Sequence, residues 1–454
     1  VGQVEDEQDL DQREHLNIVF IGHVDAGKST LSGNILYLTD HVDKRTIEKY
    51  EREAKQRNRD SWFLAFIMDT NEEERAKGKT VEVGRAYFST EHKRYTILDA
   101  PGHKSYVPNM IAGASQADIG ILVISARKGE FEAGFERGGQ TREHAMLAKT
   151  LGVKYLLVVV NKMDDPSVQW KKERWDEILG KLKPFLKSCG FKVKKEVKFI
   201  PISALTGDNV LNPVSAETCA WWPEMIASDE NPANIHGHGE LISVLDHMTL
   251  TGRDPTAPLR IPVLDRYYDK GTVIIGKVES GLLSKGDEIK LMPTGMTTRV
   301  VNLYSNEIAV RAVKPGDNVA IRCSLKQEDI CKGFMICDPP RPARAVTRFT
   351  AQLALVDLLE TRSLFTAGYD CMLHIHTCET EVVVGRLLTI VDNKTKAEKK
   401  FPRFAKTGST ITCILEVPQS IVIAPFAQAP QLGRFTLRDE GQSIAIGMVL
   451  KLAK

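Results

Sequence analysis

Runs of apolar and β-branched residues recur in the first half of the chain and predict buried strands. They cover residues 18–21, 95–98, 156–160 and 197–202, and none alternates polar with apolar as a half-exposed strand does. Segments of helical pattern, such as 29–38, lie between them. This alternation of strands and helices predicts a doubly wound, mostly parallel α/β domain.

The helical pattern varies within this domain. Residues 42–66 are highly charged and read as helix, and residues 240–248 read as the last helix before the pattern changes. Between them, residues 213–239 carry two tryptophans, two of the chain's prolines at 223 and 232, and two glycines, and read as a surface excursion. The stretch 223–239 within it has no assigned role.

After residue 251 the pattern changes to short β-branched runs separated by Gly, Pro, Asp and Asn, which predict two all-β barrels. The prolines at 339, 340 and 342 mark a boundary. We expect an acidic, disordered tail over 1–14, the α/β domain over 15–250, and barrels over 251–340 and 341–454. The expected strands are 272–279, 288–292, 318–322, 347–355, 371–377, 381–390, 410–416 and 443–450.

The first apolar run is followed by a glycine-bounded turn that is suited to phosphate. Glycines at both ends allow consecutive backbone N–H groups to face an anion, and the following helix adds the positive end of its dipole. Lys28 supplies a charge for the β- and γ-phosphates, and the Ser29 hydroxyl is a ligand for Mg²⁺. This segment alone fits an ATPase as well as a GTPase. Its residues are Gly22, His23, Val24, Asp25, Ala26, Gly27, Lys28, Ser29 and Thr30.

A second polar segment follows the run at 95–98. Its Asp99 could hold Mg²⁺ through water, and the N–H of Gly102 could meet the γ-phosphate. Such a tetrapeptide also occurs in ordinary turns. It gains meaning from its place after a strand of the same sheet, because the carboxyl ends of parallel strands bind ligands.

The third segment predicts recognition of guanine. Asn161, Lys162 and Asp164 follow the run at 156–160. A carboxylate such as Asp164 accepts two hydrogen bonds from the N1–H and N2–H₂ edge of guanine, which adenine lacks, so the wrong base would leave a buried group unpaired. The stem of Lys162 would lie along the base. Ser203, Ala204 and Leu205 follow the run at 197–202 and would offer a backbone N–H to the guanine O6. The sequence therefore predicts a GTPase.

Composition agrees with a soluble cytoplasmic protein. The 454 residues are 42% hydrophobic and 26% charged with a net charge of +2, and no apolar run approaches the roughly 20 residues that span a bilayer. The eight cysteines are irregularly spaced, as in a reduced protein. His374, His376 and Cys378 alternate on one expected strand and could hold a metal, but no further ligand cluster accompanies them, and we expect a structural role.

Five segments together resemble the translational GTPases related to elongation factor Tu and the eukaryotic alpha elongation factor. The resemblance extends from His15 over essentially the whole chain and implies a G domain followed by two β-barrels, with GTP or GDP and Mg²⁺ as ligands. The segments are residues 22–29, 99–103, 129–134, 139–144 and 161–164.

Two further segments resemble one class within this family, the eukaryotic class II release factors. Residues 77–88 resemble the corresponding segment of this class, whereas elongation factors and rescue GTPases usually carry Arg-Gly followed by Ile or Val before the threonine at the position of Thr80. Residues 433–441 are similar to the C-terminal barrel of the release factors. The implied partners are the stop-codon-reading class I release factor and the ribosome, with other translation or mRNA-decay factors binding through an N-terminal extension absent here. A rescue GTPase with a Pelota-type partner and an elongation factor carrying aminoacyl-tRNA remain alternatives.

The resemblance also implies roles for single residues. Thr80 would complete the Mg²⁺ shell with Ser29 and Asp99, and His103 would orient the attacking water. Lys79 stands where relatives have an apolar gate residue, which leaves that gate in doubt. Metabolic GTPases of similar architecture and a nucleotide-insensitive pseudo-GTPase are further alternatives, the last opposed by the intact site. The residues expected to bind the partner are Gly433, Arg434, Phe435 and Arg438.

Overall fold

The computed structural model describes residues 11–56, 62–68, 83–102, 106–135, 139–227, 239–250, 252–392 and 398–453. The chain divides into two compact units. One comprises Arg13–Lys149 with Val153–Leu250, and the other is built mainly from Thr251–Lys454. Among the described residues, no helix is both long and apolar enough to cross a membrane.

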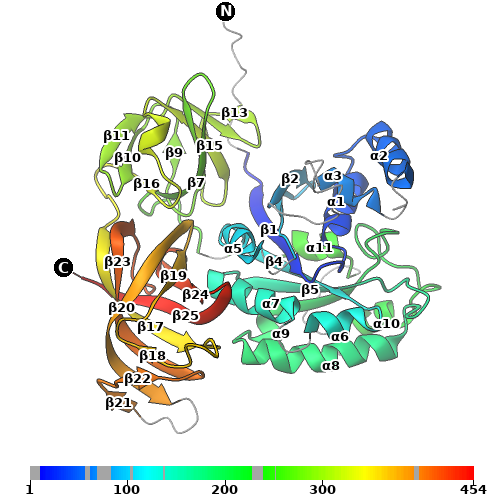
Figure 1. The fold of residues 1–454 in the computed structure, drawn as a ribbon. Coiled ribbons are helices and arrows are strands. Elements are labelled where there is room, and N and C mark those ends of the chain that lie inside the picture. The colour runs from blue at the N-terminus through cyan, green and yellow to red at the C-terminus, as the bar shows by residue number, and fades with distance from the viewer. Residues whose placement is uncertain are drawn as a thin grey trace, which may run out of the picture. The chain divides into compact units, whose positions relative to one another are not determined.

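The first unit is an α/β layer structure around a six-stranded sheet (Figure 1). The strand order is β2-β3-β1-β4-β5-β6, and every neighbouring pair is parallel except β2 with β3. The central strands are buried on both faces, as their continuous apolar runs predict. The strands are β1 Glu14–Gly22, β2 Gly84–Ser89, β3 Lys93–Asp99, β4 Ile119–Ser125, β5 Tyr155–Asn161 and β6 Val197–Pro201.

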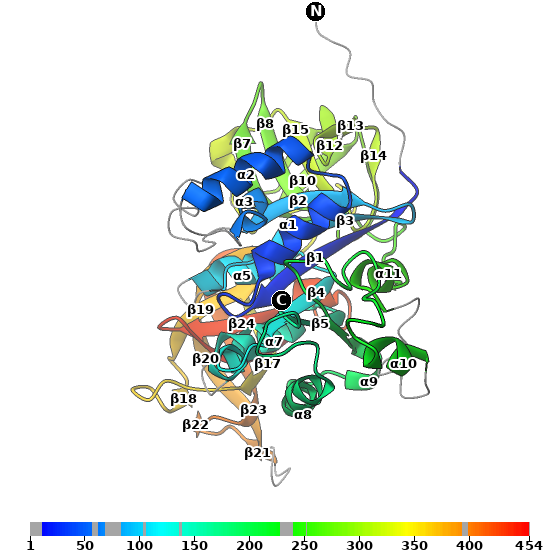
Figure 2. The same ribbon diagram turned by 90° about the vertical axis from the view of Figure 1, so that its right-hand side faces the viewer.

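Helices connect these strands and cover the sheet. The chain moves from β1 outward to β3 and then back to β4, β5 and β6, so right-handed connections place α1 on one face and α5, α7 and α8 on the other. The short helix α3 packs against α1 and β2 (Figure 2). The helices are α1 Lys28–Leu38, α2 Lys44–Gln56, α3 Ala65–Met68, α5 Val107–Ala114, α6 Glu130–Phe135, α7 Gln140–Leu151, α8 Lys172–Ser188, α9 Val193–Glu196, α10 Trp221–Ala227 and α11 Leu241–Asp246.

The second unit begins with an antiparallel eight-stranded sheet that curls around its own apolar core. Its order is β11-β10-β16-β7-β8-β15-β12-β13, and β9 pairs with β14 beside it. The strands are β7 Arg260–Tyr268, β8 Thr272–Lys277, β9 Leu283–Ser284, β10 Glu288–Met292, β11 Met296–Arg299, β12 Asn302–Ser305, β13 Ile308–Val310, β14 Ala312–Val313, β15 Asn318–Cys323 and β16 Met335–Cys337, with the 3-10 turn η3 Gln327–Asp329.

A closed barrel follows in the same unit. Its strands run in the order β19-β24-β25-β17-β23-β20, and β20 pairs with β19 to close the ring. Phe349, Phe365 and Phe435 fill its core. The elements are β17 Ala345–Leu355, β18 Phe365–Thr366, β19 Asp370–Ile375, β20 Cys378–Asp392, β21 Glu398–Lys400, β22 Phe404–Ala405, β23 Ser409–Val422, α12 Pro430–Gly433, β24 Arg434–Asp439 and β25 Gln442–Leu452.

The α/β architecture followed by two β-barrels is therefore as predicted, while several element bounds differ. Strand β1 starts at Glu14, inside the segment expected to be a tail. The charged run at 42–66 contains α2 and the start of α3, and residues 57–61 between these helices lie outside the described part. Most of the stretch at 223–239 also lies outside it.

Candidate functional site

The turn between β1 and α1 has a backbone that only its glycines allow. Gly22 has φ 142° and Gly27 has φ 94°, both in the region that side chains disfavour. A Cβ on Gly22 would also collide with the carbonyl oxygen of Val123, and one on Gly27 with the amide of Asn161. Gly27 caps the N-terminus of α1, so the turn delivers the chain directly into a helix whose positive end faces the site.

Lys28 is a buried cation within this turn. Its side chain donates hydrogen bonds to the carbonyl oxygens of Gly22 (3.2 Å) and His23 (2.8 Å). Burial lowers the pKa of Lys28 to about 8, although the nearby Asp99 and Asp25 raise it. The hydrogen-bond partners of Lys28 within the described part of the chain are backbone carbonyls, and a buried ammonium of this kind gains much from an anion such as a phosphate.

The end of β3 approaches the same ammonium. Asp99 is fully buried, and a Cβ on Gly102 would lie 2.5 Å from the Nζ of Lys28. The structure thus brings the first two predicted segments together, with a carboxylate and an ammonium in one buried place. Thr80 and His103 lie outside the described residues, so their roles stay predictions.

Asn161 connects three of the predicted segments. Its Nδ2 donates to the carbonyl oxygen of Ala26 in the phosphate turn (2.8 Å). Its Oδ1 accepts the N–H of Lys162 (2.7 Å) and the N–H of Ala204 (2.8 Å). Asn34 of α1 holds the carbonyl oxygen of Ala204 at 2.8 Å. One buried amide therefore ties the phosphate turn to both segments expected to recognise the base.

Of the base-recognition side chains, Asp164 and Leu205 are exposed and Ser203 is buried. Lys162 has φ 63°, an uncommon conformation for a residue other than glycine. This leaves the carboxylate of Asp164 accessible on a loop whose backbone is fixed from below by Asn161.

An ion-pair network that the sequence did not predict supports this loop. Glu130 of α6 accepts a hydrogen bond from Lys162 (2.8 Å) and one from Ser125 (2.7 Å). Burial raises the pKa of Glu130, but these bonds outweigh it and leave the pKa below its usual value. Arg127 pairs with Asp165 at 2.6 Å, and bonds from Ser167, with this arginine, lower the pKa of Asp165 to about 2.

His144 of α7 is a second unpredicted support. Its Nδ1 accepts the N–H of Gly22 at 3.1 Å, and its side chain is fully buried. The imidazole must therefore be neutral with its proton on Nε2. Residues 139–144 are one of the segments that resemble the family. The contact between His144 and Gly22 was not predicted, because residues 122 positions apart leave no local pattern in the sequence.

The residues expected to bind a partner lie in the closed barrel. Phe435 is 0% exposed in its core, and Arg438 is 4% exposed and donates to the hydroxyl of Ser443 (2.9 Å). Arg434 is partly exposed and its guanidinium lies 4.8 Å from the ring of Phe426. Phe435 and Arg438 therefore stabilise strand β24 from inside the barrel. Of these three side chains, only Arg434 is exposed enough to contact a partner directly.

His374 and His376 are buried in the closed barrel. His376 shares a hydrogen bond with the carbonyl oxygen of Val422 (2.9 Å), and burial lowers the pKa of each histidine to about 4. No group of three or more metal-ligating side chains occurs in the described part of the chain.

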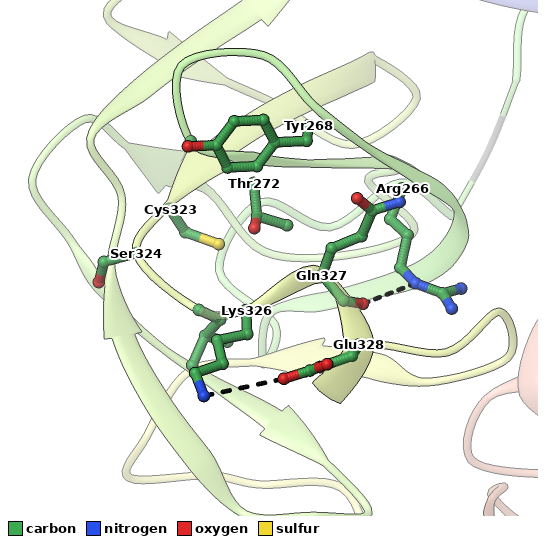
Figure 3. Close-up of a pocket in the computed structure, with 10 residues that line it drawn as sticks. Arg266, Tyr268, Thr272, Cys323, Ser324, Lys326, Gln327 and Glu328 are labelled. Carbon is green, nitrogen blue, oxygen red and sulfur yellow. Dashed lines mark hydrogen bonds and ion pairs between the residues drawn. The ribbon is translucent and has the colours of Figure 1, made fainter.

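A hollow in the eight-stranded sheet has a volume of about 690 Å³ (Figure 3). Tyr268 is 72% exposed beside it, and Arg266 donates to the carbonyl oxygen of Gln327 at 2.8 Å. It belongs to the second unit and contains none of the residues predicted for the nucleotide site.

Three protein families match successive parts of the sequence. Residues 13–251 match the elongation factor Tu GTP binding domain, 271–337 match elongation factor Tu domain 2, and 348–450 match the GTP-eEF1A C-terminal domain-like family. The first match alone covers more than half of the chain.

Curated relatives carry a more specific name. A eukaryotic peptide chain release factor GTP-binding subunit from Kluyveromyces lactis is 49% identical over 97% of this chain and 61% of its own length. The protein of the same name from Schizosaccharomyces pombe is 48% identical over 98% of this chain and 65% of its own. The chain thus spans less than two thirds of these relatives. The structure of the S. cerevisiae Ski7 GTPase-like domain bound to GTP is similar to this chain with a TM-score of 0.74 at 17% identity. The match covers 96% of this chain and 97% of the Ski7 domain, which shows a shared fold.

Proposed function

This chain belongs to the family of the elongation factor Tu GTP-binding domain, and we propose that it is the GTP-binding subunit of a translation-termination factor. The observation that carries the proposal is the buried amide of Asn161, which joins the phosphate turn to the segments for the base. The names of relatives 48–49% identical to the chain support the role in termination.

Guanine is selected by the carboxylate of Asp164 in this proposal. The side chain is exposed, so it is free to accept the N1–H and N2–H₂ donors of the base. Lys162, held by Glu130 at 2.8 Å, lies along the base plane, and the backbone of Ser203, Ala204 and Leu205 completes the pocket. Adenine has no matching pair of donors. With ATP the carboxylate of Asp164 would make no hydrogen bonds to the base, so the site would bind ATP more weakly than GTP.

The phosphates bind to residues 22–30 and to Gly102, with Lys28 as the buried cation. Ser29 and Asp99 suit a hard cation that prefers oxygen ligands, and Thr80 is proposed to join them. Mg²⁺ would neutralise charge on the β- and γ-phosphates during hydrolysis. His103 orients the attacking water, which makes the chain a GTPase that cycles between GTP and GDP in the cytoplasm.

The proposed partners are the class I release factor and the ribosome. The C-terminal barrel binds the class I factor through the segment containing Gly433 and Arg434, and nucleotide acts on a second contact made by the α/β unit. Hydrolysis then reports correct docking on a terminating ribosome. Binding to aminoacyl-tRNA or to a Pelota-type protein would instead assign the chain to the elongation or rescue class.

A competition titration tests the nucleotide assignment. Unlabelled GTP should displace a fluorescent GDP far more effectively than ATP does. Asp164→Asn should weaken GTP and favour xanthosine triphosphate, whose base presents an acceptor at the position of the guanine N2 donor. Asp176→Asn is the matched control, because Asp176 is exposed on α8 and forms an ion pair with Lys172 of the same helix. Equal displacement by ATP and GTP would reject the assignment.

A further inference from the structure

Strands β21 and β22 lie together at one end of the closed barrel (Figure 1), and the sequence in and between them is rich in aromatic and basic residues. Phe401 is 58% exposed and Phe404 is 46% exposed, although phenylalanine is usually buried. Neither belongs to the barrel core. We call this surface the aromatic–basic strip; it comprises Arg386, Lys399, Lys400, Phe401, Arg403, Phe404 and Lys406.

The backbone holds the strip in place. Strand β21 pairs with β20 at the edge of the sheet, and β22 pairs with β18. Between them the N–H of Phe401 donates to the carbonyl oxygen of Leu388 at 2.8 Å. The guanidinium of Arg386 lies 4.7 Å from the centre of the Phe401 ring. The exposed ring is therefore already oriented, and its binding costs little side-chain entropy.

The cations of the strip have no acidic partners among the residues that the structure describes. Within the described part of the chain, none of its five Lys and Arg side chains forms an ion pair, and Glu398 is the one acid on β21. Two arginines elsewhere on this barrel are paired, Arg348 with Glu416 at 3.2 Å and Arg362 with Asp439 at 3.0 Å. The strip is an unbalanced positive surface with two exposed aromatic faces.

We propose that the aromatic–basic strip binds single-stranded RNA. Unpaired nucleotides supply both matching groups in each repeat: a phosphate for a lysine or arginine, and a flat base that stacks on a phenylalanine or on an arginine plane. An acidic peptide would match the cations but leave Phe401 and Phe404 without a partner. The proposal does not depend on the nucleotide site, because the strip lies in the other compact unit.

Fluorescence anisotropy with a labelled 12-nucleotide single-stranded RNA tests the cationic contacts, using the full chain. Lys399→Ala/Lys400→Ala should reduce the slope of log affinity against log salt by about 1.4, since each lost phosphate contact removes about 0.7 for a single strand. Lys194→Ala/Lys195→Ala is the matched control, because these two adjacent lysines are also exposed and lie on α9. An equal change in both double variants would overturn the proposal.

A second pair of variants tests stacking. Phe401→Ala should weaken RNA binding by about five- to 150-fold, the range of one lost stacking contact, and Phe401→Ala/Phe404→Ala should weaken it further. Phe401→Leu should also weaken it, because leucine keeps apolar area but has no aromatic face. Full affinity with leucine, or tighter binding of a polyglutamate peptide than of RNA, would assign the strip to a protein partner and overturn the proposal. Unchanged circular dichroism and urea unfolding in all variants show that the barrel carrying the strip remains folded.

Discussion

Replacing Asn161 by alanine should damage nucleotide binding through loss of the amide that joins the loops of the site. The substitution removes three hydrogen bonds, to Ala26, Lys162 and Ala204. At about 1 kcal/mol for each neutral bond, the free energy of unfolding of the α/β unit should fall by about 3 kcal/mol. The backbone groups left unpaired and buried add to this cost.

The bonds to Ala26 and Ala204 join separate segments, so their loss should also lower the affinity for nucleotide. A nucleotide that spans the phosphate turn and the base loops must then hold them together itself, at a cost of about 2–3 kcal/mol. This corresponds to roughly 30- to 150-fold weaker binding. Titration of the Asn161→Ala variant with fluorescent GDP measures the affinity, and urea unfolding measures the stability.

Asn17→Ala provides the control for this experiment. Asn17 is also fully buried on β1, and its Nδ2 donates to Asp118 at 3.0 Å, near the opposite end of that strand from Gly22. This variant should lose stability while binding nucleotide with wild-type affinity. If Asn161→Ala bound GDP as tightly as Asn17→Ala does, the cross-linking role would be refuted.

Three further predictions concern buried groups. Burial lowers the pKa of Lys28 to about 8, so between that pH and 10.5 the folded protein without nucleotide binds fewer protons than the unfolded chain. The free energy of unfolding, measured by urea titration, should therefore rise as the pH increases through this window. Lys28→Met should abolish the rise. Gly134→Ala should weaken GDP binding severalfold, since its Cβ would lie 3.0 Å from that of His23, whereas Gly180→Ala meets open space and should leave titrations unchanged. Burial lowers the pKa of His376 from 6.5 to about 4, so the folded state resists protonation of this side chain. The free energy of unfolding should fall by about 3 kcal/mol as the pH falls from 6.5 to 4. An equal fall in the His376→Gln variant would contradict this prediction.

The sequence predicted the α/β layers and two barrels because their signals are local. Strand β10, for example, has the bounds expected from its apolar run. The expected strand at 371–377 ends instead at Ile375, because His376 turns the chain with φ 41°. Strand β7 was not predicted, since in Arg260–Tyr268 the polar and apolar residues follow no single period.

The candidate site was predictable only where neighbouring residues share one task. The phosphate turn and the Asn161–Asp164 loop are short and continuous, so their chemistry can be read directly. The contacts from Glu130 to Lys162 and from His144 to Gly22 join distant segments, and only the folded sheet brings them together.

Single-turnover hydrolysis of GTP by the full chain tests the central claim most directly. The rate should be low for the chain alone and should rise only when ribosomes and the class I release factor are both present. His103→Ala should then reduce the stimulated rate by about 100-fold or more, as expected for a lost positioning or acid–base group. Stimulation by ribosomes with aminoacyl-tRNA or a Pelota-type protein, but not with the class I factor, would contradict a role in termination.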